Sequence, residues 1–179
     1  MKNPRAARRY ALALFNLAGE TGSVEKVLDD LRRIRTLLDD SDELKAFVAH
    51  PTLTLDQQER GIRSIFEGRG SELTTRFLRF LAGRRRLAIL ASACDEYETL
   101  YLDAKNILRV SIEGAHALDA RQVEEITKKL GEMYGKKIEA DVTTEPALIG
   151  GFIVRVRDIV HDFSINGKLG RLRMQMCGA

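Results

Sequence analysis

Residues 146–172 read PALIGGFIVRVRDIVHDFSINGKLGRL, and this stretch decides the second half of the fold. It contains too many glycines for a single helix. In its middle, Phe152, Val154 and Val156 would lie on one side of a strand, and the residues at 153, 155 and 157, two of them arginines, on the other. Such alternation is typical of a β-strand. Gly150-Gly151 supplies the backbone freedom for a tight entry into a hairpin, and Ser164 can cap the basic helix that follows. The sequence therefore predicts a hairpin leading into a C-terminal helix.

The same stretch has no pattern of an active site. Gly167-Lys168-Leu169 lacks the Ser or Thr that a phosphate-binding loop needs after its lysine. His161-Asp162 would point to opposite faces of a strand, while His50 and His116 lack the spacing of a metal site. We therefore expect no catalytic residue, no metal site and no cofactor. The stretch is interpreted as a docking element.

Upstream, from Ala6 to about Ala104, apolar residues recur with helical spacing. The clearest run lies in residues 24–38, where the repeating positions are Val24, Val27, Leu28, Leu31, Ile34 and Leu38. Helix starts are predicted at four places, namely Ser23, Ser41, Thr54 with Gln57 as a capping box, and Ser71. Six short helices joined by short loops predict an all-helical bundle.

The period changes near Lys105. Alternating residues 108–113 predict a strand that ends at Gly114, and residues 138–142 predict a second strand. Between them lies a predicted helix, opened by Asp119 and closed by Gly135. The expected fold class is thus α plus α+β: a six-helix bundle over residues 1–104, then a small α+β domain over residues 105–179 with a short sheet and a C-terminal helix.

The composition describes a globular chain without membrane spans. Of 179 residues, 44% are hydrophobic and 31% charged, and the net charge of +3 is too small to argue for nucleic acid. Cys94 and Cys177 match no zinc or redox spacing, which favours reduced thiols in the cytosol. The basic start followed by an apolar run resembles a signal peptide, but Asn16 interrupts that run early. We expect no signal peptide.

The first helix carries two apolar stripes. One contains Tyr10, Ala13, Leu14 and Leu17, and the other contains Ala7, Ala11, Phe15 and Ala18. A helix that is apolar on two sides is either deeply buried or shared between its own core and a partner. The pattern alone leaves both possibilities open.

Two basic segments have alternative interpretations. Arg84-Arg85-Arg86 is either a solvated turn or a nucleic-acid patch, and the turn is favoured because no aromatic residue is interleaved with it. The final helix has an apolar face of Ile165, Leu169, Leu172 and Met176. This face could lie on lipid, but we expect it to pack on the sheet or on a partner helix, because the helix is short and the face lacks aromatics.

Three motifs together resemble the delta-subunit family of bacterial F-type ATP synthases, equivalent to the mitochondrial oligomycin-sensitivity-conferring protein. They are ARRYALALF at residues 7–15, AGRRRL at 82–87, and LIGGF through DFSINGKL at 148–169. Length and the helical-then-mixed order agree as well. The chain departs from the family pattern at the hairpin turn, where Arg157-Asp158 replaces the usual Gly-Asp, and at Phe163, which replaces a glycine.

The resemblance implies a non-catalytic stator protein, present in one copy within a hetero-oligomer. Its helical domain would grip the N-terminal helices of the alpha subunits, and its α+β domain would hold the b subunits of the peripheral stalk, so that the catalytic head does not turn with the rotor. The complex would place it peripherally at the cytoplasmic face of the inner membrane, without insertion into the bilayer and without nucleic acid.

The resemblance also suggests contact residues. For the alpha helix they are Tyr10, Ala13, Leu14, Phe77, Phe80 and Leu81; for the b subunits they are Leu169, Leu172 and Met176. The alternative function is a helical nucleic-acid-binding adaptor that uses Arg84–Arg86.

Overall fold

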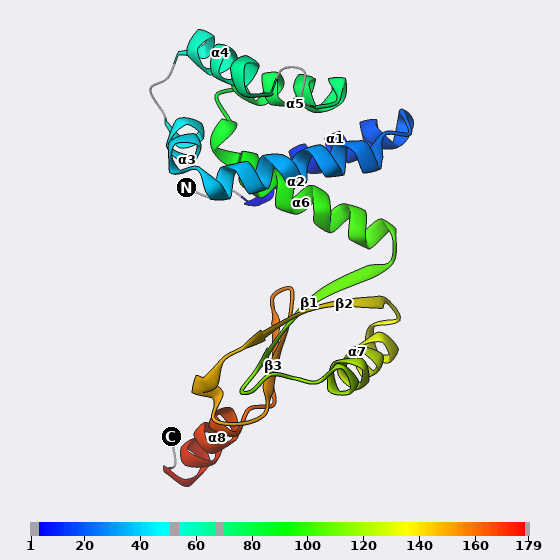
Figure 1. Cartoon of the computed structure of the whole chain (residues 1–179), viewed down its shortest axis with the longest axis vertical. Coiled ribbons are helices and arrows are strands. Elements are labelled where there is room, and N and C mark those ends of the chain that lie inside the picture. The colour runs from blue at the N-terminus through cyan, green and yellow to red at the C-terminus, as the bar shows by residue number, and fades with distance from the viewer. Residues whose placement is uncertain (1–3, 51–53, 67–69, 178–179) are drawn as a thin grey trace. The chain divides into compact units, whose positions relative to one another are not determined.

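A computed structural model describes residues 4–50, 54–66 and 70–177 (Figure 1). The chain divides into two compact units, Met1–Tyr101 and Leu102–Ala179. Unit 1 is helical, and unit 2 combines helices with a four-stranded sheet. The expected fold class is confirmed. The assignment of residues 1–104 and 105–179 to two different partners stays a prediction.

The helices of unit 1 lie close to the expected positions. They are α1 (Pro4–Glu20), α2 (Val24–Asp40), α3 (Asp42–Ala49), α4 (Leu55–Phe66), α5 (Glu72–Gly83), the 3-10 turn η1 (Leu87–Ile89) and α6 (Leu90–Ala104), whose last residues belong to unit 2. The core holds the predicted α2 stripe Val27, Leu28, Leu31, Ile34 and Leu38. Tyr97 of α6 is fully buried within it, and its hydroxyl donates to the Val24 carbonyl at 3.2 Å.

Side chains cap three of the four helices for which a cap was predicted. Ser41 accepts from the Leu44 amide, and Ser71 accepts from the Thr74 amide. Thr54 and Gln57 form the reciprocal bonds of a capping box. Ser23 does occupy the N-cap of α2 as predicted, but its side chain makes no cap hydrogen bond and its hydroxyl pairs with that of Thr21 at 2.7 Å instead.

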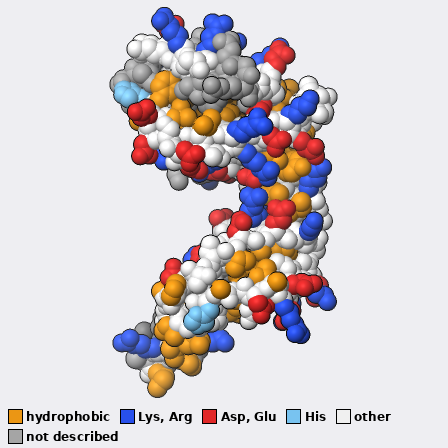
Figure 2. Space-filling view, in the orientation of Figure 1, with side chains coloured by type: hydrophobic (Ala, Val, Ile, Leu, Met, Phe, Trp, Pro, Cys, Tyr) orange, Lys and Arg blue, Asp and Glu red, His pale blue; other side chains and the backbone are white. Residues whose placement is uncertain are grey.

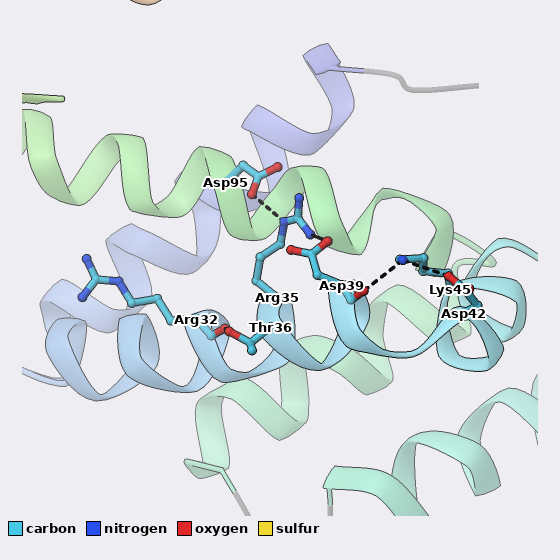
Figure 3. A network of polar contacts seen from close by, with 7 residues as sticks. All are labelled: Arg32, Arg35, Thr36, Asp39, Asp42, Lys45 and Asp95. Carbon is cyan, nitrogen blue, oxygen red and sulfur yellow. Dashed lines mark hydrogen bonds and ion pairs between the residues drawn. The ribbon is translucent and has the colours of Figure 1, made fainter. Parts of the chain in front are cut away.

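Charged side chains join α2 to its neighbours on the surface of unit 1 (Figure 3). Arg35 reaches Asp95 of α6 at 2.8 Å and also pairs with Asp39 one turn along α2. Lys45 of α3 donates to the Asp39 carbonyl at 3.0 Å. Because these groups are largely exposed, each pair contributes only about 0–1 kcal/mol. They link α2 to α6 and to α3 across the surface of unit 1.

Unit 2 is built around one mixed sheet. Its elements are β1 (Ile107–Gly114), α7 (Ala120–Tyr134), β2 (Lys137–Thr144), η2 (Pro146–Leu148), β3 (Phe152–Val156), β4 (Ile159–Asp162) and α8 (Ile165–Cys177). The strand order is β2-β1-β3-β4, with β2 parallel to β1 and the other pairs antiparallel. The inward residues Val110, Ile112 and Val154 form the core together with Leu130 of α7.

Two predicted signals delimit α7. Asp119 and Gln122 form a capping box at its start. Gly135 ends the helix with φ 63°, the left-handed conformation that glycine adopts without steric cost.

The stretch 146–172 forms the predicted hairpin and helix. Gly151 has φ 80°, which confirms that the entry needs glycine. A Cβ at Gly150 would stand 2.5 Å from Ile165 Cδ1, so the segment before β3 lies tightly against the start of α8. Ser164 Oγ accepts from the Gly167 amide at 2.9 Å, as a helix cap does, and donates to Asp162 Oδ1 at 2.6 Å.

The hairpin turn at Arg157-Asp158 has two central residues. Arg157 has φ 52°, a left-handed value that the two-residue hairpins of proteins require and usually assign to glycine or asparagine. Its guanidinium pairs with Asp103. The departure from the family pattern is therefore accommodated with the turn intact.

Candidate partner-binding surfaces

One face of α1 is core and the other lies at the surface. Ala7, Ala11, Leu14 and Ala18 are buried at helical spacing. On an adjacent side of the helix Ala13 is exposed, Tyr10 is half-buried and Leu17 is 49% exposed. The two predicted stripes therefore need one correction: Leu14 belongs to the core stripe. The second stripe has no covering element in the described part of unit 1.

Helix α5 divides in the same way. Phe77 and Leu81 are buried in the core, whereas Phe80 is 48% exposed. The rings of Phe80 and Tyr10 meet edge to face, with their centroids 5.9 Å apart. The structure thus brings Tyr10, Ala13 and Phe80 to a surface of α1 and α5, and it places the other three predicted contacts, Leu14, Phe77 and Leu81, in the core.

Three arginines surround this aromatic pair. The guanidinium carbon of Arg84 lies 5.5 Å from the Phe80 ring centroid, and those of Arg9 and Arg86 lie 5.6 and 5.9 Å from the Tyr10 centroid. These are cation–π distances. No aromatic residue is interleaved with the arginine turn in the sequence, but aromatic rings lie beside it in three dimensions: Phe80 one turn before Arg84 on α5, and Tyr10 on α1. No local pattern could have revealed the contact between Arg86 and Tyr10.

The turn after α5 explains how two of these arginines reach the rings. Arg86 donates its backbone N–H to the Leu81 carbonyl at 2.8 Å, which folds the chain back onto the helix end. Arg85 has φ 54°, a left-handed conformation uncommon for residues other than glycine. We refer to Tyr10, Phe80, Arg9, Arg84 and Arg86 as the aromatic–arginine cluster.

Unit 2 carries a second unpartnered apolar surface. The face of α8 formed by Ile165, Leu169, Leu172 and Met176 is exposed, and Met176 is 86% exposed. Figure 2 shows hydrophobic side chains gathered at this end of unit 2. The face therefore does not pack on the sheet, which was one of the two expectations for it.

A groove also opens between α7 and the sheet of unit 2. It has a volume of about 490 Å³ and is lined by Leu118, Ile126, Met133, Phe152 and Phe163, among others. The Phe152 and Phe163 rings lie 5.3 Å apart at its wall. No local motif in the sequence predicts this groove, because its walls come from α7 and the sheet, which meet only through tertiary packing.

The side chains that could be considered for catalysis, those of His161, Asp162 and Cys94, have structural roles. Asp162 holds Ser164, and His161 Nε2 lies 3.1 Å from the Tyr134 hydroxyl, so the two adjacent residues are not joined as a catalytic pair. Burial raises the pKa of the Cys94 thiol to about 12. Across the residues that the structure describes, no group of three or more His, Cys, Asp or Glu could hold a metal ion. No described helix is long and apolar enough to cross a membrane.

Comparison with known proteins decides the family. The model of the family "ATP synthase delta (OSCP) subunit" matches residues 6–176. The chain belongs to this family. Among curated members, ATP synthase subunit delta of Agrobacterium fabrum is 36% identical over 171 residues, covering 95% of this chain and 91% of the relative. The corresponding protein of Chlorobaculum tepidum is 33% identical over 173 residues, covering 97% and 96%.

Solved structures agree with this assignment. A chain of the Toxoplasma gondii mitochondrial ATP synthase hexamer superposes with a TM-score of 0.74 at 28% identity, covering 97% of this chain and 98% of that one. A chain of the Polytomella F-ATP synthase matches 55% of this chain and 88% of its own length, with a TM-score of 0.52 at 25% identity. The resemblance seen in the sequence motifs is confirmed, and with it a function as a delta (OSCP) subunit of an F-type ATP synthase. A role in the peripheral stalk fits this family.

Proposed function

We propose that the chain is a non-catalytic mechanical link in the stator, with a different partner on each unit. Unit 1 binds the N-terminal helix of an alpha subunit of the catalytic head, and unit 2 binds the C-terminal ends of the b subunits. One copy joins the complex peripherally, at the cytoplasmic face of the inner membrane. By holding the head against the stalk, the link keeps the head from turning with the rotor.

The exposed stripe on α1 and α5 carries the first half of this proposal. Tyr10, Ala13 and Leu17 follow one another at spacings of three and four residues, so they form a continuous line along α1. Phe80 extends this line sideways onto α5. An amphipathic helix presents side chains at the same spacing, which is the complementarity that helix-in-groove recognition uses.

The apolar face of α8 supports the second half. Four large side chains are exposed there at helical spacing, with Leu169, Leu172 and Met176 at its centre and end. Soluble proteins rarely leave such a contiguous apolar face uncovered. The far ends of the stalk b subunits are the partner we assign to this face.

A binding titration of the full chain tests the first contact. We expect a synthetic peptide of the alpha N-terminus from the same organism to bind with a Kd at or below micromolar, measured by isothermal calorimetry. Phe80→Ala should weaken binding by about tenfold or more, the effect of losing a central aromatic contact. Leu37→Ala is the matched control, because Leu37 is similarly exposed (43%) but lies on α2. No binding to a folded sample would refute the alpha contact.

The second contact has its own test. A peptide from the C-terminal end of the b subunits should bind the full chain, and Leu169→Ser with Leu172→Ser should abolish that binding while leaving the alpha peptide unaffected. Equal binding by this double variant and by Leu37→Ser would show that α8 is not the contact.

A further inference from the structure

We propose that the aromatic–arginine cluster selects its partner by charge: Arg9, Arg84 and Arg86 recognise carboxylates that flank the apolar stripe of the bound helix. The partner of unit 1 is then an acidic amphipathic helix, not any apolar one. This inference rests on the proposed contact with the alpha N-terminus and specifies the side chains that make it selective.

The charge balance of the cluster is the first support. Three guanidiniums lie within 6 Å of two adjacent ring centroids. Among the described residues, no ion pair joins Arg9, Arg84 or Arg86 to a carboxylate, whereas Arg32 and Arg35 of α2 pair with Glu98 and Asp95 of α6, each at 2.8 Å. The cluster therefore presents uncompensated positive charge at the rim of an apolar surface, which is complementary to carboxylates on a partner.

The chemistry of arginine is the second support. A guanidinium held near an aromatic face keeps N–H groups available at its edge, and these can donate in pairs to a carboxylate. The rings thus orient Arg84 and Arg86 before a partner arrives, which lowers the conformational entropy lost on binding.

The backbone of the turn is the third support. Arg85 lies in the left-handed region, which for a residue with a Cβ costs roughly 1–2 kcal/mol. This conformation belongs to the chain reversal that carries Arg84 onto Phe80 and Arg86 onto Tyr10. The conformation is that of a left-handed helix end, in which the Arg85 and Arg86 amides donate to the Ala82 and Leu81 carbonyls, and these bonds fix where the turn places the two arginines.

Single-stranded nucleic acid is the competing class of partner, since it also uses arginines and aromatic rings. Two features favour a helix. The rings of Tyr10 and Phe80 meet at 62°, so they do not form the parallel platforms on which successive bases stack. The apolar line also continues from the cluster to Leu17, about 10 Å along α1. Apolar side chains of a bound helix can pack against Leu17, whereas a phosphate backbone cannot.

The experiment uses the full chain and the alpha N-terminal peptide in two forms: its own sequence, and a version in which every Asp and Glu is replaced by Asn or Gln. Affinity is measured over a series of salt concentrations. The protein variants are Arg84→Gln, Arg86→Gln and their combination. Arg33→Gln on α2 is the matched control. It removes the same charge, but α2 contributes no residue to the aromatic–arginine cluster.

We expect the peptide's own sequence to lose affinity with salt and the neutral version to bind more weakly and nearly independently of salt. Each cluster variant should raise the Kd by about two- to fivefold, the size of a partly exposed ion pair. The same variants should leave the affinity of the neutral peptide unchanged, since the partner charge is already gone. Arg86→Lys should restore part of the loss by returning the charge.

The outcomes separate the two proposals. Equal binding of both peptides to all variants would overturn the charge inference and leave the alpha contact standing. An alpha N-terminus without acidic side chains beside its apolar stripe would do the same. Absence of any peptide binding would overturn the alpha contact and the inference together. Tighter binding of a poly-U oligonucleotide than of the peptide, lost in Arg84→Gln, would assign the cluster to nucleic acid.

Discussion

Gly151 lies directly against the carbonyl oxygen of Phe163, with no room between them for a side chain. Gly151 opens β3, and Phe163 separates β4 from α8, so this contact holds the hairpin entry against the start of the last helix. The Phe163 amide also donates to the Phe152 carbonyl at 3.0 Å. Gly151 is therefore needed because two backbone segments touch there.

Replacing Gly151 by alanine should destabilise unit 2 by about 1–3 kcal/mol. The new Cβ meets the Phe163 carbonyl, and the φ of 80° is unfavourable for any residue with a Cβ. Hydrogen exchange of the β1 and β3 amides in the full chain measures this unit separately from unit 1. Gly170→Ala is the control, because a Cβ there meets nothing and should stabilise α8 slightly. Equal exchange rates in both variants would contradict the close contact.

Much of this fold could be predicted, because the deciding signals are local. The alternation of residues 152–156 and the caps at Ser164 and Asp119 each involve neighbours within a few positions, and each was confirmed. Ser23 shows the limit of such signals: the correct residue type stands at the helix start, but a competing hydroxyl two positions away takes its hydrogen bond.

The binding surface on unit 1 could be predicted only in part. Helical spacing identified two apolar stripes on α1, but it could not assign Leu14 to the core, since that depends on how the helix is rotated against its neighbours. The position of Arg86 beside Tyr10 requires a tertiary contact between α1 and the turn after α5. Spacing along the sequence contains no information on such a contact.

Truncation of two phenylalanines one turn apart on α5 should have different effects: one mainly lowers stability, and the other mainly weakens binding. Phe77→Ala should lower the free energy of unfolding of unit 1 by about 3–5 kcal/mol, because its side chain lies in the core and is only 8% exposed. Phe80→Ala should cost about 1 kcal/mol or less, mainly the edge-to-face contact with Tyr10, yet it should weaken the binding of the alpha peptide. Chemical denaturation and calorimetry measure the two effects. A large stability loss in Phe80→Ala would place this ring in the core instead.

The Cys94 thiol should resist modification in the folded protein. Burial raises its pKa to about 12, and the side chain is only 3% exposed, so both the thiolate and its access are suppressed near neutral pH. In a Cys177→Ser background, a disulfide reagent such as DTNB should react slowly in buffer and fully in denaturant, as followed by absorbance. Equal rates under the two conditions would mean that α6 opens readily around Cys94.

Acid should weaken unit 2 through Asp103. Hydrogen bonds from Lys136, at 2.8 Å, and from Arg157 hold the pKa of this carboxyl below its ordinary 3.8. The unfolded chain therefore takes up the proton first as the pH falls, so the contribution of Asp103 is complete above its ordinary pKa and is lost as the pH drops through the lowered one. Because the groups are partly exposed, that contribution is about 0–1 kcal/mol.

The variant Asp103→Asn isolates this effect. It should be less stable than the natural chain near pH 7 and nearly equal to it below the lowered pKa of Asp103, where the carboxyl is neutral in both states. Hydrogen exchange of the β1 amides, or the thermal midpoint of unit 2, gives the comparison at each pH. Asp141→Asn serves as the control, because Asp141 on β2 has an exposed side chain. A stability difference that persists unchanged into acid would mean that Asp103 acts through shape and hydrogen bonding, and that its charge toward Lys136 and Arg157 contributes nothing.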